Sequence, residues 1–132
     1  MSELESIAGQ KQYMEQAIAA LDVRINDMRA ALKAFSDSVE TVKAINKEGA
    51  SDILCSAGPN IMFRAKIVEP SNVLMMIGSD VVVEKSAEDA INNCEGKIKE
   101  AQTTLDELLN ARYYNAMQLA ALNKRLAEMV NT

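Results

Sequence analysis

The segment VVVEKSAEDA, residues 81–90, changes its structural preference in the middle. It opens with three consecutive valines, which are typical of a strand. Ser86, Glu88 and Asp89 are typical of the first turn of a helix. The serine hydroxyl can accept a hydrogen bond from the backbone N–H three residues later, and carboxylates are favoured at the positive end of the helix dipole. The segment therefore predicts a junction between a β region and a helix.

The residues after this junction follow a heptad repeat. With Ile91 at position a, residues 91–129 are apolar at every a and d position except Arg112 and Asn115. Residues 4–42 follow the same pattern, counted from Leu4, with Lys11 as the one polar exception. Apolar spacings of three and four residues kept over almost six heptads favour coiled-coil helices. The a and d positions are called the seam below.

The two repeats fit each other when they are placed antiparallel. If Val42 lies opposite Ile91, each a residue of one repeat faces a d residue of the other, and Leu4 reaches Met129. Nothing requires the two repeats to have the same length, so this agreement favours a hairpin of two helices within one chain. The alternative is that each helix pairs with another chain. We favour the hairpin because a long insertion joins the inner ends of the two repeats.

This insertion, residues 50–85, has the pattern of four short strands. The strand candidates and the turns between them are DILCS (52–56), AGPN (57–60), IMFRAKIV (61–68), EPSN (69–72), VLMMIG (73–78), GSD (78–80) and VVVEK (81–85). These strands form two β-hairpins, which are marginally stable alone and leave unpaired edges for strands of another chain. We therefore expect oligomerisation through a sheet or barrel.

These elements together predict a mainly α fold with a small β region. A long antiparallel coiled-coil hairpin has its inner ends joined by two β-hairpins, in one domain over residues 1–132. We expect a helix over 1–48, the β region over 50–85 and a second helix over 86–132. The segment EGAS (48–51) ends the first helix, with Gly49 as its C-cap.

The sequence contains no constellation typical of catalysis. It has no histidine, which removes the commonest general base and the commonest metal ligand. It has no glycine-rich phosphate loop and no C-x-x-C pair. Cys55 and Cys94 fit the role of small apolar side chains, in a strand and on the seam. We therefore expect no enzyme activity, no bound metal and no cofactor.

Composition excludes further classes of function. Hydrophobic residues make up 48% of the 132 residues but aromatic residues only 4%, which suits helices packed side by side. The net charge of -5 argues against a nucleic-acid partner. No signal peptide is visible, and no apolar stretch approaches the roughly 18 residues of a membrane span. We therefore expect a cytoplasmic protein with neither nucleic acid nor membrane as partner.

The polar seam residues Lys11, Arg112 and Asn115 have two interpretations. Isolated polar residues in a seam often fix the register of a coiled coil at a cost in stability. Alternatively, they weaken the seam so that the helix ends near the chain termini separate. Separation would expose to a partner the apolar residues Leu4, Ile7, Met14, Leu119, Leu122, Leu126 and Met129.

The order of helix, two β-hairpins and helix resembles the prefoldin family. NVLMMIGSDVVVEKSAEDAI, residues 72–91, is similar to the signature of its alpha class, and SAGPNIMFRAKI, residues 56–67, resembles the first hairpin of that class. Two turns depart from the family pattern. CSAGP stands where a Pro-Leu-Gly-type approach is common, and Gly78-Ser79-Asp80 stands for Gly-x-Gly. Asp80, at the third position, can adopt a left-handed conformation, though less readily than glycine.

The resemblance implies a chaperone without ATPase activity, either the archaeal alpha subunit or the related fifth eukaryotic subunit. Such subunits form hexamers of two alpha-class and four beta-class chains through β-barrels. Their distal helix ends hold unfolded proteins and deliver them to a group II chaperonin in the cytosol. By analogy, the residues that mediate assembly are Ile53, Ile61, Phe63, Ile67, Val73, Met75, Ile77, Val81 and Val83. The alternative is a structural coiled-coil scaffold without affinity for unfolded chains.

Overall fold

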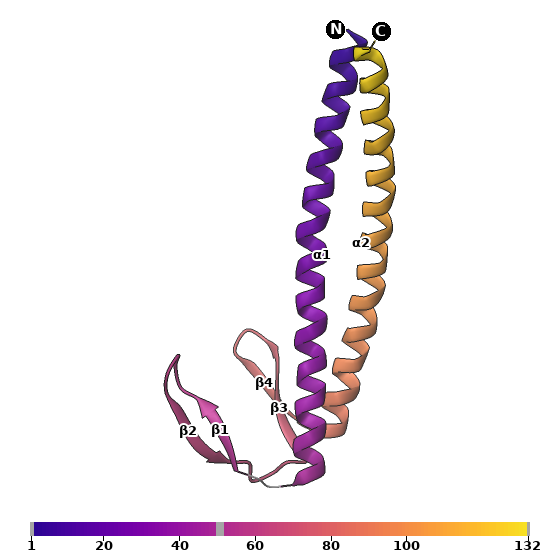
Figure 1. Cartoon of the computed structure of the whole chain (residues 1–132). Helices are drawn as coiled ribbons and strands as arrows, with labels where there is room; N and C mark the ends of the chain where they lie inside the picture. Colours follow the sequence, from indigo (N-terminus) through magenta and orange to yellow (C-terminus); the bar gives the residue numbers. More distant parts are fainter. Residues whose placement is uncertain (1, 50–51, 132) are drawn as a thin grey trace. The chain divides into compact units, whose positions relative to one another are not determined.

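A computed structural model describes residues 2–49 and 52–131. In chain order the elements are α1 (Glu3–Glu48), β1 (Asp52–Ser56), β2 (Met62–Lys66), β3 (Asn72–Gly78), β4 (Val81–Ser86) and α2 (Ala87–Val130) (Figure 1). The predicted fold class, two long helices with two small β-hairpins between them, is confirmed. The chain divides into two compact units, which we describe separately. The helical unit comprises the residues up to Leu32 and from Glu100 onward, and the hairpin unit comprises Lys33–Lys99.

The ends of α1 are capped by small residues. At its start the backbone N–H of Glu5 donates to the hydroxyl of Ser2, at 3.2 Å. At its end the N–H of Gly49 donates to the carbonyl of Ile45, at 3.0 Å. Gly49 has φ of 80°, a left-handed conformation that costs glycine little. The predicted cap is therefore confirmed, while residues 50–51 of EGAS lie outside the described residues, as does residue 1 of the predicted helix.

The helical unit is held together by the seam. Its α1 and α2 segments run side by side in opposite directions, with both chain ends at the same end of the unit (Figure 1). Ile25, Leu105 and Leu108 are buried and form a cluster. Leu21, Met28, Leu32 and Leu109 pack against that cluster. Ile25 and Leu108 are opposite seam positions in the antiparallel alignment derived from the sequence, so the structure has that alignment in this unit.

The hairpin unit contains the junction between strand and helix. The backbone N–H of Asp89 donates to the hydroxyl of Ser86 at 3.0 Å, so Ser86 is the N-cap of α2 as predicted. The N–H of Ala87 donates to the carbonyl of Ser71 at 2.7 Å, which ties the first residue of α2 to the turn before β3. Ala87 and Ala90 are buried, as is Val39 of α1 in the same unit. The second helix thus begins at Ala87, one residue later than predicted, because Ser86 also ends β4.

The strands form two separate antiparallel pairs. β1 pairs with β2, with Cys55 opposite Phe63, and β3 pairs with β4, with Met75 opposite Val83. The second ladder has a register shift between Met76 and Gly78. Asp80 has φ of 62°, so it does adopt the left-handed conformation that the turn Gly78-Ser79-Asp80 demands.

The second predicted strand, 61–68, is too long at both ends. β2 comprises Met62–Lys66, so Ile61, Ile67 and Val68 lie outside it. The carbonyl of Ile61 accepts one bond from the N–H of Ala57, at 2.9 Å, but the ladder ends at Ser56 opposite Met62. At the other end the ladder stops at Asp52 opposite Lys66, next to residues 50–51, which lie outside the described residues. A strand extends only as far as it pairs with a neighbouring strand. The alternation within one segment does not report how far that pairing extends.

Candidate functional site

The two β-hairpins expose an unusual amount of apolar surface. In the first hairpin Leu54, Met62 and Phe63 are exposed, and in the second Leu74, Met76 and Val82 are exposed, by 51% to 74%. Scattered apolar residues are normal on a protein surface, but a group on one small element marks an interaction site.

The two faces of the second hairpin differ. Val73, Met75 and Val83 are half-buried, whereas their strand neighbours Leu74 and Met76 are exposed. Successive side chains of a strand point to opposite faces, so these two groups occupy different faces. The half-buried face has its cover within the same unit. A hollow of about 450 Å³ lies between the second hairpin and α2, and Met76 reaches its edge although its side chain is mostly exposed. The hollow is lined by Met75, Met76, Ile77, Val83, Glu84 and Lys85 of the hairpin and by Asp89, Asn93 and Lys97 of α2.

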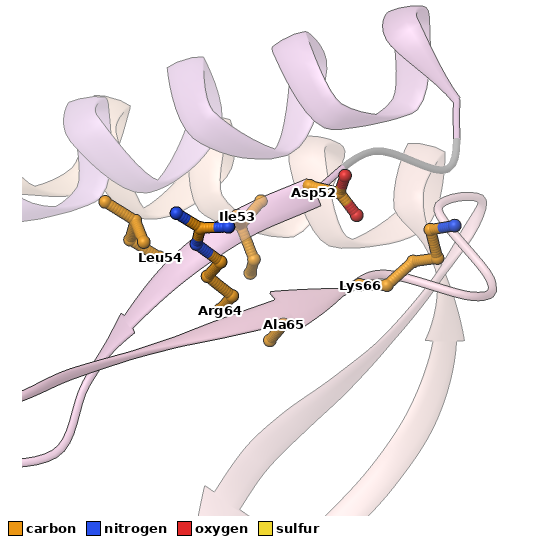
Figure 2. A pocket seen from close by; sticks show the side chains of 6 residues that line it. All are labelled: Asp52, Ile53, Leu54, Arg64, Ala65 and Lys66. Carbon is orange, nitrogen blue, oxygen red and sulfur yellow. The ribbon is translucent and has the colours of Figure 1, made fainter.

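The first hairpin carries charges beside its apolar side chains. An open hollow of about 640 Å³ is lined by Asp52, Ile53, Leu54, Arg64, Ala65 and Lys66 (Figure 2). Figure 2 shows Leu54 of β1 next to Arg64 of β2, which is its partner in the strand register. An apolar side chain beside a guanidinium group combines area for burial with a charge that can select a partner.

The strand edges offer backbone hydrogen-bonding groups. Each sheet has two strands, so every described strand has one edge without a neighbouring strand. Unpaired N–H and C=O groups along such an edge can pair with a strand of another chain. The hairpins thus provide both apolar faces and open edges for association.

The predicted assembly residues have mixed environments. The half-buried ones are Ile53, Ile67, Val73, Met75 and Val83, and the exposed ones are Ile61, Phe63, Ile77 and Val81. Sequence reasoning missed the exposed residues Leu54, Met62, Leu74, Met76 and Val82. For Leu74, Met76 and Val82 the available signal was the absence of alternation in VLMMIG and VVV, where adjacent apolar residues must occupy both faces of a strand.

The helix ends near the chain termini are closed. Ile7 is buried, Leu4 is exposed, and the other predicted client-contact residues are half-buried, namely Met14, Leu119, Leu122, Leu126 and Met129. The guanidinium of Arg125 in α2 is ion-paired with Glu3 in α1. The two helices of this unit are therefore paired close to their ends.

Arg112 has a partner on the opposite helix. Its Nε donates to Oδ1 of Asp22, and its Nη2 lies 3.4 Å from Oδ2 of the same carboxylate. The hydrogen bond from Arg112 holds the pKa of Asp22 below its usual range; desolvation opposes this shift, and the charge of Arg112 adds to it. The same hydrogen bond and charge raise the pKa of Arg112. A two-pronged contact between helices favours the register-fixing interpretation for this residue.

The other two polar seam residues behave differently. Nζ of Lys11 lies 3.8 Å from a carboxylate oxygen of Glu15, one turn along the same helix. Asn115 is half-buried. The contact of Lys11 within its own helix does not link the two helices, so it does not favour register fixing at this position.

The described residues provide neither a metal site nor a membrane-spanning helix. Over residues 2–49 and 52–131, no group of His, Cys, Asp and Glu side chains could hold a metal ion. Neither helix, within the same residues, contains an apolar run long enough to cross a membrane.

Comparison with known proteins gives a consistent result. A family model described as "Prefoldin subunit" matches residues 14–132. The chain is 30% identical over 118 residues to prefoldin subunit alpha of Methanospirillum hungatei, which covers 89% of this chain and 78% of that protein. It is 28% identical over 130 residues to prefoldin subunit alpha of Pyrococcus horikoshii, covering 96% and 82% respectively.

A solved structure has the same fold. The cryo-EM structure of filamentous PFD from Methanocaldococcus jannaschii contains a chain that superposes with a TM-score of 0.61. The match covers 91% of this chain and 94% of that chain, at 20% sequence identity. At this identity the likeness concerns the fold alone.

Proposed function

Because the chain belongs to the prefoldin family of chaperones, as an alpha-class subunit, we propose that it acts as a holdase within a hexamer. The hexamer contains two alpha-class and four beta-class subunits. It binds unfolded polypeptides without ATP, at the distal helix ends, and delivers them to a group II chaperonin in the cytoplasm.

The observation that supports assembly best is the exposed apolar surface of the hairpins. Leu54, Met62, Leu74, Met76 and Val82 are exposed on sheets that have only two strands each. Isolated two-stranded sheets are marginal in water, and closing them into a barrel removes their edges. The predicted assembly residues from Ile53 to Val83 lie in or next to the same strands. Strands of other prefoldin subunits are the partners proposed for them.

The apolar residues near the chain ends are proposed to contact the unfolded protein. Leu4 is exposed, and Met14, Leu122 and Leu126 are half-buried. Methionine side chains adapt to partners of irregular shape, which suits the binding of many sequences.

The test uses the chain after assembly with a beta-class prefoldin subunit. A chemically denatured protein is diluted into buffer without ATP, and its aggregation is followed by light scattering. We expect suppression at one assembled complex per client, and no change when ATP is added. Aggregation at the rate of the client alone would instead favour a structural scaffold without affinity for unfolded chains. The mass of the chain, alone and with the beta-class subunit, tests the assembly separately.

A further inference from the structure

The helical unit has a hollow on one side of its paired helices. It measures about 390 Å³ and is lined by Gln10, Tyr13 and Met14 of α1 and by Gln118, Ala121, Leu122 and Arg125 of α2. We call this hollow the lateral groove. Met14 and Leu122 belong to the seam, so the groove gives access to seam residues from the side.

One exposed tyrosine lines the groove, and a second lies one helical turn from it on α2. Tyr13 lines it, yet 71% of its surface is exposed. Tyr114 is 62% exposed and lies on the same stripe of α2 as Gln118, Ala121 and Arg125, at spacings of four, seven and eleven residues. Exposed aromatic side chains around a hollow are typical of binding sites, because each buries a large area with few rotatable bonds.

The charges around the groove select against charged ligands. Residues 113–123, YYNAMQLAALN, contain no charged side chain. Arg125 is the one charged residue among those that line the groove, and it is ion-paired with Glu3. A charged ligand residue would lose water here without gaining a free partner, which is unfavourable. Gln10 and Gln118 offer amide donors and acceptors that can bond the backbone of an extended peptide.

Access to the groove does not require the helices to separate. Ile7, on the seam near the chain ends, is only 3% exposed, and the Glu3–Arg125 pair joins the two helices in the same region. The groove is open although these contacts are made. Its volume is near the lower end of the roughly 300–1,000 Å³ typical of ligand pockets, which suits a few side chains rather than a folded partner.

We propose that the lateral groove binds a short, uncharged segment of an unfolded polypeptide, rich in aromatic and aliphatic residues, while the helix ends remain paired. The inference rests on the proposed function and specifies the class of segment held and the direction from which it enters. It differs from the separation of the helix ends considered for the polar seam residues.

The first experiment measures peptide binding to the full chain. Two fluorescently labelled twelve-residue peptides are used, one with Leu, Phe, Tyr, Ser and Asn, and one in which two Ser residues are replaced by Asp. Fluorescence anisotropy should show binding of the uncharged peptide and at least about tenfold weaker binding of the acidic one, from the cost of desolvating the carboxylates. Equal binding of the two peptides would overturn the proposed selectivity.

A pair of variants locates the binding site. Ala121→Trp fills the groove, whereas Ala30→Trp adds the same ring at an exposed position of the same unit outside the groove. Ala121→Trp should weaken binding of the uncharged peptide by at least about tenfold, the effect of losing the burial of one apolar side chain. Ala30→Trp should bind the peptide as tightly as the wild type. Circular dichroism verifies that both variants remain helical. If Ala121→Trp binds as tightly as the wild type, the groove is not the site.

A disulfide across the helix ends separates lateral entry from opening. Leu4→Cys combined with Met129→Cys places a thiol on each helix at opposite seam positions of the predicted register. The variant should bind the peptide with the same affinity whether this disulfide is oxidised or reduced. The wild type, which contains Cys55 and Cys94, is treated identically as a control. Loss of binding only in the oxidised variant would overturn lateral entry and support separation of the ends.

The two proposals can fail independently. If the assembled chaperone suppresses aggregation but the full chain does not bind the uncharged peptide, the groove is wrong and the holdase function stands. If the peptide binds with the expected selectivity but aggregation is not suppressed, the groove stands as a peptide site and the holdase function is wrong.

Discussion

The helical unit buries apolar side chains of its seam, whereas the hairpin unit leaves many apolar side chains exposed. In the helical unit Ile25, Leu105 and Leu108 are buried against seam residues of the same chain. In the hairpin unit Leu74 and Met76 remain exposed although they lie in a regular strand. The helices therefore bury their apolar stripes against each other within one chain, whereas the hairpins leave apolar side chains exposed. One region of a chain can therefore bury its apolar surface by itself, while another region of the same chain needs a partner to do so.

The largest expected effect concerns the exposed face of the second hairpin. Met76→Lys should leave the unfolding free energy of the isolated chain within about 0.5 kcal/mol, because Met76 is exposed. Assembly with other prefoldin subunits should be lost, since an unpaired charge buried in an interface costs several kcal/mol. Native mass spectrometry measures the assembly, with Ser79→Lys in the adjacent turn as control. A full-sized complex from Met76→Lys would show that this face is not in the interface.

The same substitution on the opposite face sharpens the comparison. Met75 is half-buried whereas Met76 is 74% exposed, although both line the hollow next to α2. Met75→Lys should therefore destabilise the isolated chain measurably, unlike Met76→Lys. Urea denaturation of the two variants, followed by circular dichroism, compares them directly. Equal midpoints would mean that the two faces do not differ in the isolated chain.

A substitution in the seam should have the next largest effect, which is a loss of unfolding free energy. Leu108→Ala removes a buried side chain from the cluster with Ile25 and Leu105 and should cost about 2–5 kcal/mol of unfolding free energy. Val23→Ala, at an exposed site of α1 in the same unit, should cost less than about 0.5 kcal/mol. Urea denaturation of the isolated chain measures both. A small loss for Leu108→Ala would mean that the seam is not the main source of stability.

A substitution at the junction between β4 and α2 should lower the unfolding free energy by a smaller amount. Ser86→Ala removes the hydroxyl that accepts the N–H of Asp89 and should cost about 1 kcal/mol of unfolding free energy. Ser79→Ala, a matched change in the exposed turn between β3 and β4, serves as control. If both variants unfold at the same urea concentration as the wild type, the cap does not contribute to stability.

The ion pair between the helices should give the smallest effect and a dependence on pH. Folding lowers the pKa of Asp22, so the pair stabilises the folded state above the ordinary aspartate pKa of about 4. That stabilisation disappears as the pH falls through the lower pKa of the folded state. Asp22→Asn should therefore lower the urea midpoint at pH 7 but have a smaller effect near pH 2. The exposed Asp27→Asn is the control, and an Asp22→Asn effect independent of pH would contradict this assignment.

Much of the fold could be predicted from local patterns. The heptads predicted both helices and their alignment, because the two apolar stripes have the same length and match a to d when they are placed antiparallel. Ser86 and Gly49 were identified as caps because capping depends on a few neighbouring backbone groups. The ends of β2 were wrong, because the length of a strand depends on its partner and alternation reports only its own segment.

The candidate sites were less accessible to sequence reasoning. The partner of Arg112 was not anticipated, since Asp22 lies ninety residues away and beside the seam rather than on it. Leu74, Met76 and Val82 were missed because the central residues of β3 and the start of β4 are apolar on both faces, with no polar residue to mark a solvent face. The lateral groove depends on which side chains of the two helices lie next to each other, which neither heptad shows alone.

The sequence by itself determined the helices, the strand order, the junction at Ser86 and the alignment of the seam, because each follows from a period or a cap within a few residues. Only the tertiary structure decided which hairpin face is covered, which residue neutralises Arg112 and where Met14 and Leu122 are accessible. These features depend on side chains that are distant in sequence. A strand that is apolar on both sides has two equivalent faces until packing against a neighbouring helix distinguishes them.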